Sequence, residues 1–329
     1  MKTDERGVTA VIVAICATVL FGVGALVIDE GAARQERREL QNGADAGALA
    51  LAQDCAKGAC TNLDAKAVSY AGFNAVDGAS RATANTISGN GVQVIARTQD
   101  AGANTDGNDH TVDFYLAPVL GGPRGAEVSA TATARWGAPS GGTTLPLTFS
   151  LCEWQALVAG GVFSTTPRVI LFHDPTQSNL KQGAPACPSG PAGQDIPGGF
   201  GWLALISGTC STTVNAGNWI SYNPGNGVPN TCSPSDWQNK DVFISVYDNI
   251  LSQKDPGWAN QCSKDPCYHI YGVAEMHITG YHFPGNTWNQ PCKSSQSCIA
   301  GYFIKFTIGW DGGSTGGVDL GTNEVFLTQ

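Results

Sequence analysis

The stretch from residue 8 to residue 55 reads VTAVIVAICATVLFGVGALVIDEGAARQERRELQNGADAGALALAQDC. Its first part, residues 8–28, is uncharged, and a helix of that length spans roughly 30 Å, the thickness of a bilayer core. A cleaved signal peptide has a shorter apolar core that ends in a small-residue cleavage site. We therefore expect a retained transmembrane helix at 8–28, preceded by a short cytoplasmic leader at 1–7.

The chain remains compatible with helix beyond the apolar run, which predicts a stem helix over residues 29–60. Small and apolar residues recur on one face at helical spacing, and Gly43 and Gly47 form a G-x-x-x-G pattern. Such a face either folds back on its own domain or lets a partner helix approach closely. The predicted helix-packing interface consists of Leu40, Gly43, Ala44, Gly47, Ala48 and Leu51.

Residues 61–136 are expected to hold a helix followed by strands. The sequence Thr61-Asn62-Leu63-Asp64 resembles a capping box that starts a helix reaching about residue 76. The apolar period then changes to two, which predicts strands at 92–98, 110–118 and 126–136. Residues 100–109 form a turn-rich connection without the ligand spacing of a calcium loop.

A Gly, Pro and Ser-rich linker is predicted at residues 137–147, and a Cys-rich β ectodomain at 148–329. Its expected strands lie at 167–173, 201–206, 241–251, 268–283 and 301–310. The predicted fold class is α+β, with an N-terminal transmembrane and stem helix followed by a disulfide-braced, mainly β ectodomain.

Ten of the eleven cysteines lie beyond the apolar run, and an even set there indicates disulfides in an oxidising compartment. The disulfide candidates are Cys55, Cys60, Cys152, Cys187, Cys210, Cys232, Cys262, Cys267, Cys292 and Cys298. Proximity favours the pairs Cys55–Cys60, Cys262–Cys267 and Cys292–Cys298. For the other four cysteines we expect Cys187–Cys210 and Cys152–Cys232. The close C-x-x-C spacing of a zinc site does not occur.

Positive residues flank the apolar run on both sides, with slightly more of them after it. This distribution leans against an external C-terminal region, whereas the cysteines favour one. Long domains translocate largely regardless of charge, so we expect a single-pass cell membrane protein with a cytoplasmic N-terminus and an extracytoplasmic C-terminal domain.

The net charge of −9 argues against nucleic acid as a partner, because a phosphate binder needs a basic footprint. No G-x-S-x-G turn stands before a predicted helix, as a serine hydrolase would require, and the Gly-Lys-Ser/Thr ending of a phosphate loop does not occur. Glu275 and His277 share one face of a predicted strand and, with Asp248 or His173, would suit a metal or acid–base site. The alternative is a polar strand face, and we predict no catalytic residue, metal site or cofactor.

Aromatic residues in loops rich in Gly and Asn offer a second possibility. They either bind sugar or pack beneath their loops. The four candidates are Trp219, Tyr222, Trp258 and Trp288. This alternative describes a membrane-tethered adhesion or carbohydrate-binding envelope protein whose partner is a glycan or a host surface.

The segments DERGVTAVIVA (residues 4–14) and LVIDEGAARQERRELQNGADAGALALA (residues 26–52) resemble the N-terminus of TadE/TadG-like Flp pilus-assembly proteins. The run from Leu40 to Ala50 carries the most specific part of this resemblance, and AEVSATATARWG (residues 126–137) resembles a strand of such proteins. The second half is similar to actinobacterial members.

The resemblance implies a membrane-anchored, non-enzymatic component of a Flp/Tad pilus and secretion system, either pseudopilin-like or an assembly factor. Its partners would be Tad/Flp machinery subunits, pilin-like helices and the lipid bilayer. Pilins of this system are cut after a Gly and carry Glu at the fifth mature position, whereas Ile12 stands fifth after Gly7 here. The D-x-S-x-S metal motif found in some longer TadG-like proteins is also missing from this sequence.

Overall fold

The computed structural model describes residues 6–76, 78, 80–99, 111–173, 186–187, 196–253, 255–262, 266–308 and 315–328. The expected turn-rich connection at 100–109 lies outside the described residues, as does most of the leader. The chain divides into two compact units, residues 1–135 with 326–329 and residues 136–325. The predicted α+β class, a long N-terminal helix followed by mainly β structure with disulfides, is confirmed.

Helix α1 (Arg6–Ala56) is a single unbroken helix that contains both the apolar run and the stem. It lacks Pro, and its stem is rich in Ala, the best helix former. Gly58 follows the helix in the left-handed conformation, and its N–H donates to the carbonyl of Cys55. The Cys55–Cys60 disulfide closes this turn. Helix α2 (Leu63–Asn74) begins directly after it.

The predicted capping box at the start of α2 is wrong. Asn62 is the N-cap residue, with a left-handed φ of 56°, and its side chain makes no capping hydrogen bond. The Asp64 carboxylate accepts a hydrogen bond from the backbone N–H of Ala84 instead, at 2.7 Å. Asp64 therefore ties the helix to the neighbouring strand rather than to its own first turn.

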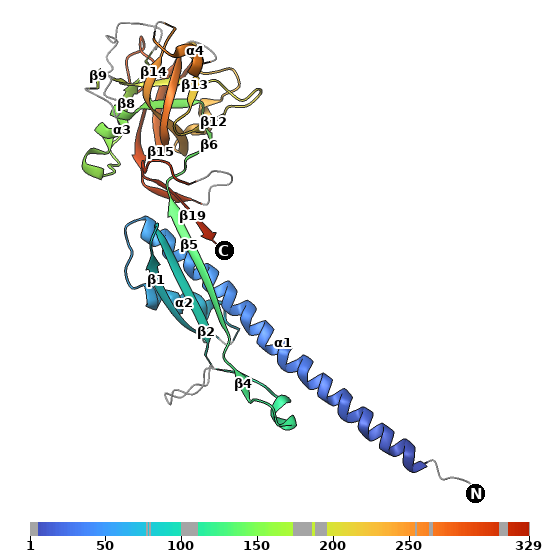
Figure 1. Cartoon of the computed structure of the whole chain (residues 1–329). Helices are drawn as coiled ribbons and strands as arrows, with labels where there is room; N and C mark the ends of the chain where they lie inside the picture. Colours follow the sequence, from blue (N-terminus) through green and yellow to red (C-terminus); the bar gives the residue numbers. More distant parts are fainter. Residues whose placement is uncertain are drawn as a thin grey trace. The chain divides into compact units, whose positions relative to one another are not determined.

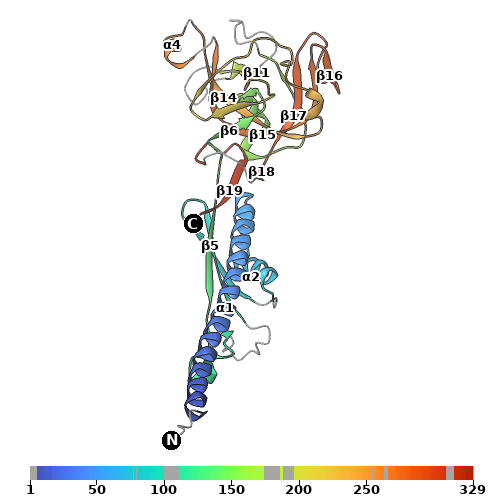
Figure 2. The ribbon, with the colours of Figure 1, turned by 90° about the vertical axis from the view of Figure 1, so that its right-hand side faces the viewer.

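Strands β1 (Ser80–Ile87), β2 (Gly91–Thr98) and β5 (Ser129–Gly137) form an antiparallel sheet, and α1 and α2 cover one of its faces (Figures 1 and 2). Strand β1 was not predicted from the sequence. Gly89 and Asn90 both adopt positive φ in the tight turn that joins β1 to β2. The covered face carries mostly small residues, which allow close helix packing: Ala82, Ala84, Val92, Val94, Ala96, Ala130, Ala132 and Ala134.

The predicted strand at 110–118 is mostly not a strand. Only β3 (Val112–Asp113) is extended, and it pairs with β4 (Gly125–Ala126). Between them lies a short 3-10 helix, η1 (Ala117–Leu120), with Pro118 in its first turn, where the fixed φ of Pro suits a helix start. The C-terminal strand β19 (Thr322–Thr328) returns residues 326–328 to this unit, where Thr328 Oγ1 donates to the carbonyl of Thr133.

The second unit is built on a sheet of order β11-β7-β14-β15-β17-β8, with β13 and β16 also paired to β15. Its strands are β7 (Leu147–Ser150), β8 (Arg168–Leu171), β11 (Phe200–Trp202), β13 (Trp219–Ser221), β14 (Asp241–Leu251), β15 (Cys267–Phe283), β16 (Asn286–Trp288) and β17 (Cys298–Ile304). The β14–β7 pair is parallel and the other pairs are antiparallel.

Shorter elements complete this unit. They are β6 (Gly141–Thr144), α3 (Leu151–Leu157), η2 (Ala159–Gly161), β9 (Ala186–Cys187), β10 (Ile196–Pro197), β12 (Thr212–Asn215), η3 (Pro234–Trp237), α4 (Trp258–Gln261) and β18 (Phe306–Ile308). Strand β6 lies within the range predicted as a linker and pairs with β12. Strand β18 runs parallel to the first part of β19.

Large aromatic side chains fill the core of the second unit. Phe200 packs edge-on against Trp202 and Phe283, with ring centroids 6.2 Å apart in each case. Gly201 lies between Phe200 and Trp202 in sequence, and a Cβ there would collide with the phenol of Tyr268. Each fully buried large apolar side chain stabilises the fold by about 1.5–3 kcal/mol, so this cluster is a main source of the unit's stability.

Candidate functional site

The buried face of the stem is the helix-packing interface predicted from the sequence, and α2 and β2 of the same chain cover it. Leu40, Ala44, Ala48 and Leu51 are at most 2% exposed. A Cβ added to Gly43 would lie 2.9 Å from the Cα of Ala71. Of the two alternatives that the sequence left open, the helix thus folds back on its own domain, and this face is not open to a partner helix.

The apolar run at residues 8–28 has the opposite environment, because no other part of the described chain covers it. Its large side chains stand free, with Leu20 72% and Phe21 76% exposed. The helix that contains this run is long and apolar enough to cross a membrane. A Cβ added to Gly22 or Gly24 would meet no atom within 4 Å. This segment is the candidate membrane span.

Asp29 directly follows the apolar run and is only 4% exposed. Its carboxylate accepts hydrogen bonds from the backbone N–H groups of Ala117 at 2.6 Å, Tyr115 at 2.9 Å and Leu116 at 3.2 Å. These N–H groups precede or begin η1 and have no partner within that short helix, so the carboxylate caps it. Burial raises the pKa of Asp29, but the three hydrogen bonds outweigh this effect and hold the pKa below its usual value.

This role of Asp29 was not predicted from the sequence. Pro118 is the feature of the sequence that could have indicated a helix in the segment predicted as a strand. Pro is common in the first turn of a helix and lacks the N–H that a strand ladder needs. A short helix there requires an acceptor for its first N–H groups, and a nearby carboxylate is the usual one. Only the fold, however, identifies Asp29 as that acceptor.

A polar groove of about 390 Å³ lies beside the stem. It is lined by Glu30, Ala33, Arg34, Arg37, Glu127, Val128 and Ser129. Arg34 pairs with Glu30 at 2.8 Å, and Arg81 pairs with Glu127 at 3.1 Å. The charges of the groove are therefore largely balanced, and exposed pairs of this kind each contribute at most about 1 kcal/mol.

The histidines of β15 form two separate pairs with aspartates of β14. His269 Nδ1 lies 2.5 Å from Asp248 Oδ1, and His277 Nδ1 lies 2.6 Å from Asp241 Oδ1. The strand register places these pairs at opposite ends of β14. Among the described residues, no group of three His, Cys, Asp or Glu side chains is arranged to hold a metal ion.

A β-bulge interrupts the alternation of side chains along β15 between His277 and His282. The register with β17 shifts between Ile278 and Gly280. Ile278 and Tyr281, three residues apart, are consequently both in the core. His282 is displaced to the side away from the core, where its Nδ1 lies 2.7 Å from Thr287 Oγ1.

Glu275 is a buried acid, 4% exposed, and no hydrogen-bond partner is found for its Oε2 atom. Burial, followed by the negative charge of Asp241, raises the pKa of Glu275 to about 7. A raised pKa suits a general acid or base. Asp241, whose charge acts on Glu275, also bonds to His277, and the His277 ring stacks on that of Tyr302.

The four loop aromatics proposed for sugar binding are spread over several elements and mostly pack against protein. Trp219 lies 5.0 Å from the ring of His269, and Trp288 lies 5.9 Å from Tyr281, measured between ring centroids. Tyr222 is 5% exposed. Of the tryptophans that the structure describes, only the buried Trp202 lines the open groove of about 440 Å³ beside residues 205–208 and 223–231.

Four disulfides are defined between described cysteines. Three of them join Cys55–Cys60, Cys262–Cys267 and Cys292–Cys298, the pairs expected from proximity. The fourth joins Cys210 to Cys232, so the predicted pairs Cys187–Cys210 and Cys152–Cys232 are wrong. Cys152 is also disulfide-bonded, and the side chain of Cys187 lies outside the described part of the chain.

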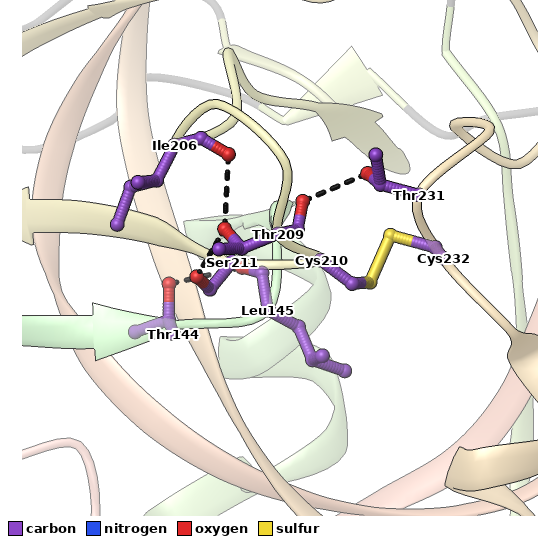
Figure 3. The surroundings of a disulfide bond; sticks show 8 residues. All are labelled: Thr144, Leu145, Ile206, Thr209, Cys210, Ser211, Thr231 and Cys232. Atoms are coloured by element: carbon purple, nitrogen blue, oxygen red, sulfur yellow. Dashed lines mark hydrogen bonds between the residues drawn. A yellow bond between two sulfur atoms is a disulfide. The ribbon is translucent and has the colours of Figure 1, made fainter.

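Local hydrogen bonds bring Cys210 and Cys232 together (Figure 3). Thr231 Oγ1 donates to the carbonyl of Thr209 at 2.7 Å, so the residues that precede the two cysteines are joined as well. Thr209 Oγ1 in turn donates to the carbonyl of Ile206 at 2.9 Å. The Cys210–Cys232 disulfide thus joins the two loops that border the groove lined by Trp202.

Residues 7–54 match the family model of the putative Flp pilus-assembly TadE/G-like proteins. The chain carries a TadE/G-like pilus-assembly segment. The match lies within α1 and covers the apolar run, Asp29 and the buried stem face. No curated protein and no solved structure matches the chain. The family relationship therefore rests on the long helix, and it supports a role in Tad pilus assembly.

Proposed function

We propose that this TadE/G-like chain is a membrane-anchored, non-enzymatic component of a Flp/Tad pilus and secretion system, acting as a pseudopilin-like subunit or an assembly factor. One observation carries the proposal. The family match falls on α1, and residues 8–28 of that helix are uncovered by the rest of the described chain. An apolar helix of this length requires lipid or partner helices around it.

The division of α1 into a covered stem and an uncovered span supports contacts with pilus machinery along its uncovered part. The stem face containing Gly43 and Gly47 is occupied by the chain's own α2 and β2. Partner helices therefore contact residues 8–28 within the membrane or the exposed side of the stem. Glycines 22 and 24 have room for such a close approach.

The orientation in the membrane is part of this proposal. The disulfides of both units favour an oxidising compartment, which supports an extracytoplasmic location for the part of the chain beyond residue 28. The non-enzymatic assignment is supported by the two dispersed His–Asp pairs, which lie toward opposite ends of β14. Adhesion to a glycan or a host surface stays a prediction. The four loop aromatics give it no support, since they do not converge on one exposed surface.

The test replaces residues 8–28 of the full chain with an unrelated apolar span of equal length. The proposal expects the protein to remain in the membrane with its disulfides intact, while pilus number and co-purification of Tad components fall. A gene deletion should abolish pilus formation. Normal pili in both strains, together with unchanged co-purification of Tad components with the altered chain, would contradict the proposal.

A smaller change gives a matched comparison within the same helix. Gly22→Leu adds a side chain where nothing lies within 4 Å, so the folded domain is undisturbed and only a partner in the membrane is affected. Val19→Leu enlarges a neighbouring position that is already 60% exposed and serves as the control. Reduced recovery of Tad components with the first variant alone would support a close helix contact at Gly22.

A further inference from the structure

The segment between β3 and β4 presents apolar side chains to solvent. Residues 114–120 read FYLAPVL and contain no charged residue. Tyr115 is 75% exposed and Val119 is 79% exposed. A folded domain gains nothing from placing such residues in water, and two of them on one short loop form an apolar surface that nothing in the described chain covers. We name residues 114–122 the Asp29-bound loop.

The position of this loop along α1 is fixed by Asp29. The backbone N–H groups of residues 115–117 bind the Asp29 carboxylate, and Asp29 is the first residue after the apolar run. Because α1 is one unbroken helix, no hinge separates the run from Asp29. Both ribbon views show the loop beside the middle of α1, near the end of the apolar run (Figures 1 and 2). With residues 8–28 spanning a bilayer, Asp29 lies at the membrane surface, about 15 Å from the bilayer centre.

We propose that the Asp29-bound loop is a second membrane contact, with Tyr115 and Val119 inserted into the interface between headgroups and acyl chains. This inference rests on the proposed membrane anchor. Tyr is enriched at this depth because its ring is apolar and its hydroxyl is polar. Val119 adds apolar area, and the exposed Arg124 at the end of the loop is suited to lipid phosphates.

The hydrogen bonds of Asp29 fit the same location. An ionised carboxylate at the edge of the hydrocarbon is costly unless polar groups replace its water. The loop supplies three N–H donors to this carboxylate and buries it. The loop and the acid are therefore complementary, because the acid holds the loop at the interface and the loop shields the acid from lipid.

The experiment uses the full chain in vesicles of phosphatidylcholine and phosphatidylglycerol that carry a spin label at a shallow acyl position. Val119→Cys is labelled with an environment-sensitive fluorophore in a Cys16→Ala background, and the unsubstituted background measures non-specific labelling. We expect blue-shifted emission and several-fold stronger quenching at position 119 than at Phe73→Cys. Phe73 is the matched control, since it is 82% exposed in the same unit and lies on α2, which packs farther along α1 at Gly43.

Labelling the native Cys16, which is a free and exposed cysteine within the apolar run, separates the two proposals. Quenching at Cys16 together with water-like emission at position 119 overturns the loop contact alone and leaves the loop surface for a protein partner. Water-like emission at both positions overturns the membrane anchor and the loop contact together.

A second variant tests the hold of Asp29 on the loop. Asp29→Asn should reduce the quenching at position 119 several-fold while leaving Cys16 quenched, because an amide is a poorer acceptor for three N–H groups. Glu30→Gln is the control, since Glu30 pairs with Arg34 on the helix surface. Quenching at position 119 that is unchanged by Asp29→Asn would overturn the role of Asp29 in positioning the loop.

Discussion

The backbones of Gly43 and Ala71 meet where α1 crosses α2, and a Cβ added to Gly43 would lie 2.9 Å from the Cα of Ala71. A contact this close leaves no room for a side chain at position 43. The atoms that the added Cβ would meet belong to the backbone of α2, and a helix backbone cannot shift one residue at a time. The small residues of the stem are therefore required by packing within the chain, and this requirement is itself testable.

Gly43→Ala should lower the free energy of unfolding of the first unit by about 1–3 kcal/mol, since the added methyl overpacks a rigid contact. The same substitution at Gly31 is the control, because a Cβ there meets nothing within 4 Å and Ala favours helix by up to about 1 kcal/mol. Denaturant unfolding of the detergent-solubilised chain measures both values. Equal effects at the two positions would contradict the observed packing.

The hold of Asp29 on residues 115–117 should depend on pH. The pKa of Asp29 is lowered in the folded chain, so its stabilising contribution is fully present above the unfolded value of about 3.9 and is lost as the pH falls through the folded pKa. Hydrogen exchange should show protected amides at Tyr115 and Ala117 at neutral pH, and this protection should be lost only as the pH falls below 3.8 and through the lowered pKa of Asp29. In Asp29→Asn these amides should be less protected at every pH, and unaltered protection would argue against the capping role.

Glu275 should make the second unit less stable as the pH rises. Its pKa is raised from 4.5 to about 7 on folding, so the favourable protonated form is fully present below 4.5 and is lost as the pH rises through 7. Glu275→Gln should remove this dependence and raise the free energy of unfolding at pH 8 by on the order of 1–2 kcal/mol. Unfolding curves at pH 5 and pH 8 test this, and a wild-type chain equally stable at both would contradict it.

Removal of the Cys210–Cys232 bond should destabilise the second unit by about 3 kcal/mol, because the bond closes a loop of 22 residues in the unfolded chain. The Cys292–Cys298 bond closes a loop of only 6 residues and should contribute about 2 kcal/mol. Double Cys→Ala variants of each pair measure the difference by denaturant unfolding. Non-reducing peptide mapping checks the pairing itself, and a recovered Cys152–Cys232 peptide would contradict the structure.

The elements with strong local patterns were the most predictable. The strand predicted at 241–251 coincides with β14, and the strand predicted at 268–283 differs from β15 by one residue. Both were predictable because their sequences contain many β-branched and aromatic residues. Strand β1 was missed because SRATANTI contains small and polar residues whose burial depends on the helices above them. The strand predicted at 110–118 was largely wrong because its alternating pattern was outweighed by Pro118 and by the distant acceptor Asp29.

The sequence by itself determined the membrane-length apolar run, the continuous helix that follows it, the disulfide-rich β region and the TadE/G-like resemblance. These features depend on composition, on local periodicity and on the order of neighbouring residues, and all three are evident without the tertiary structure. Only the tertiary structure decided that the stem face packs on α2, that Asp29 binds residues 115–117 and that Cys210 bonds to Cys232. Each of these joins residues 22 or more positions apart, and their proximity results from the packing of the whole unit, which local sequence pattern does not specify.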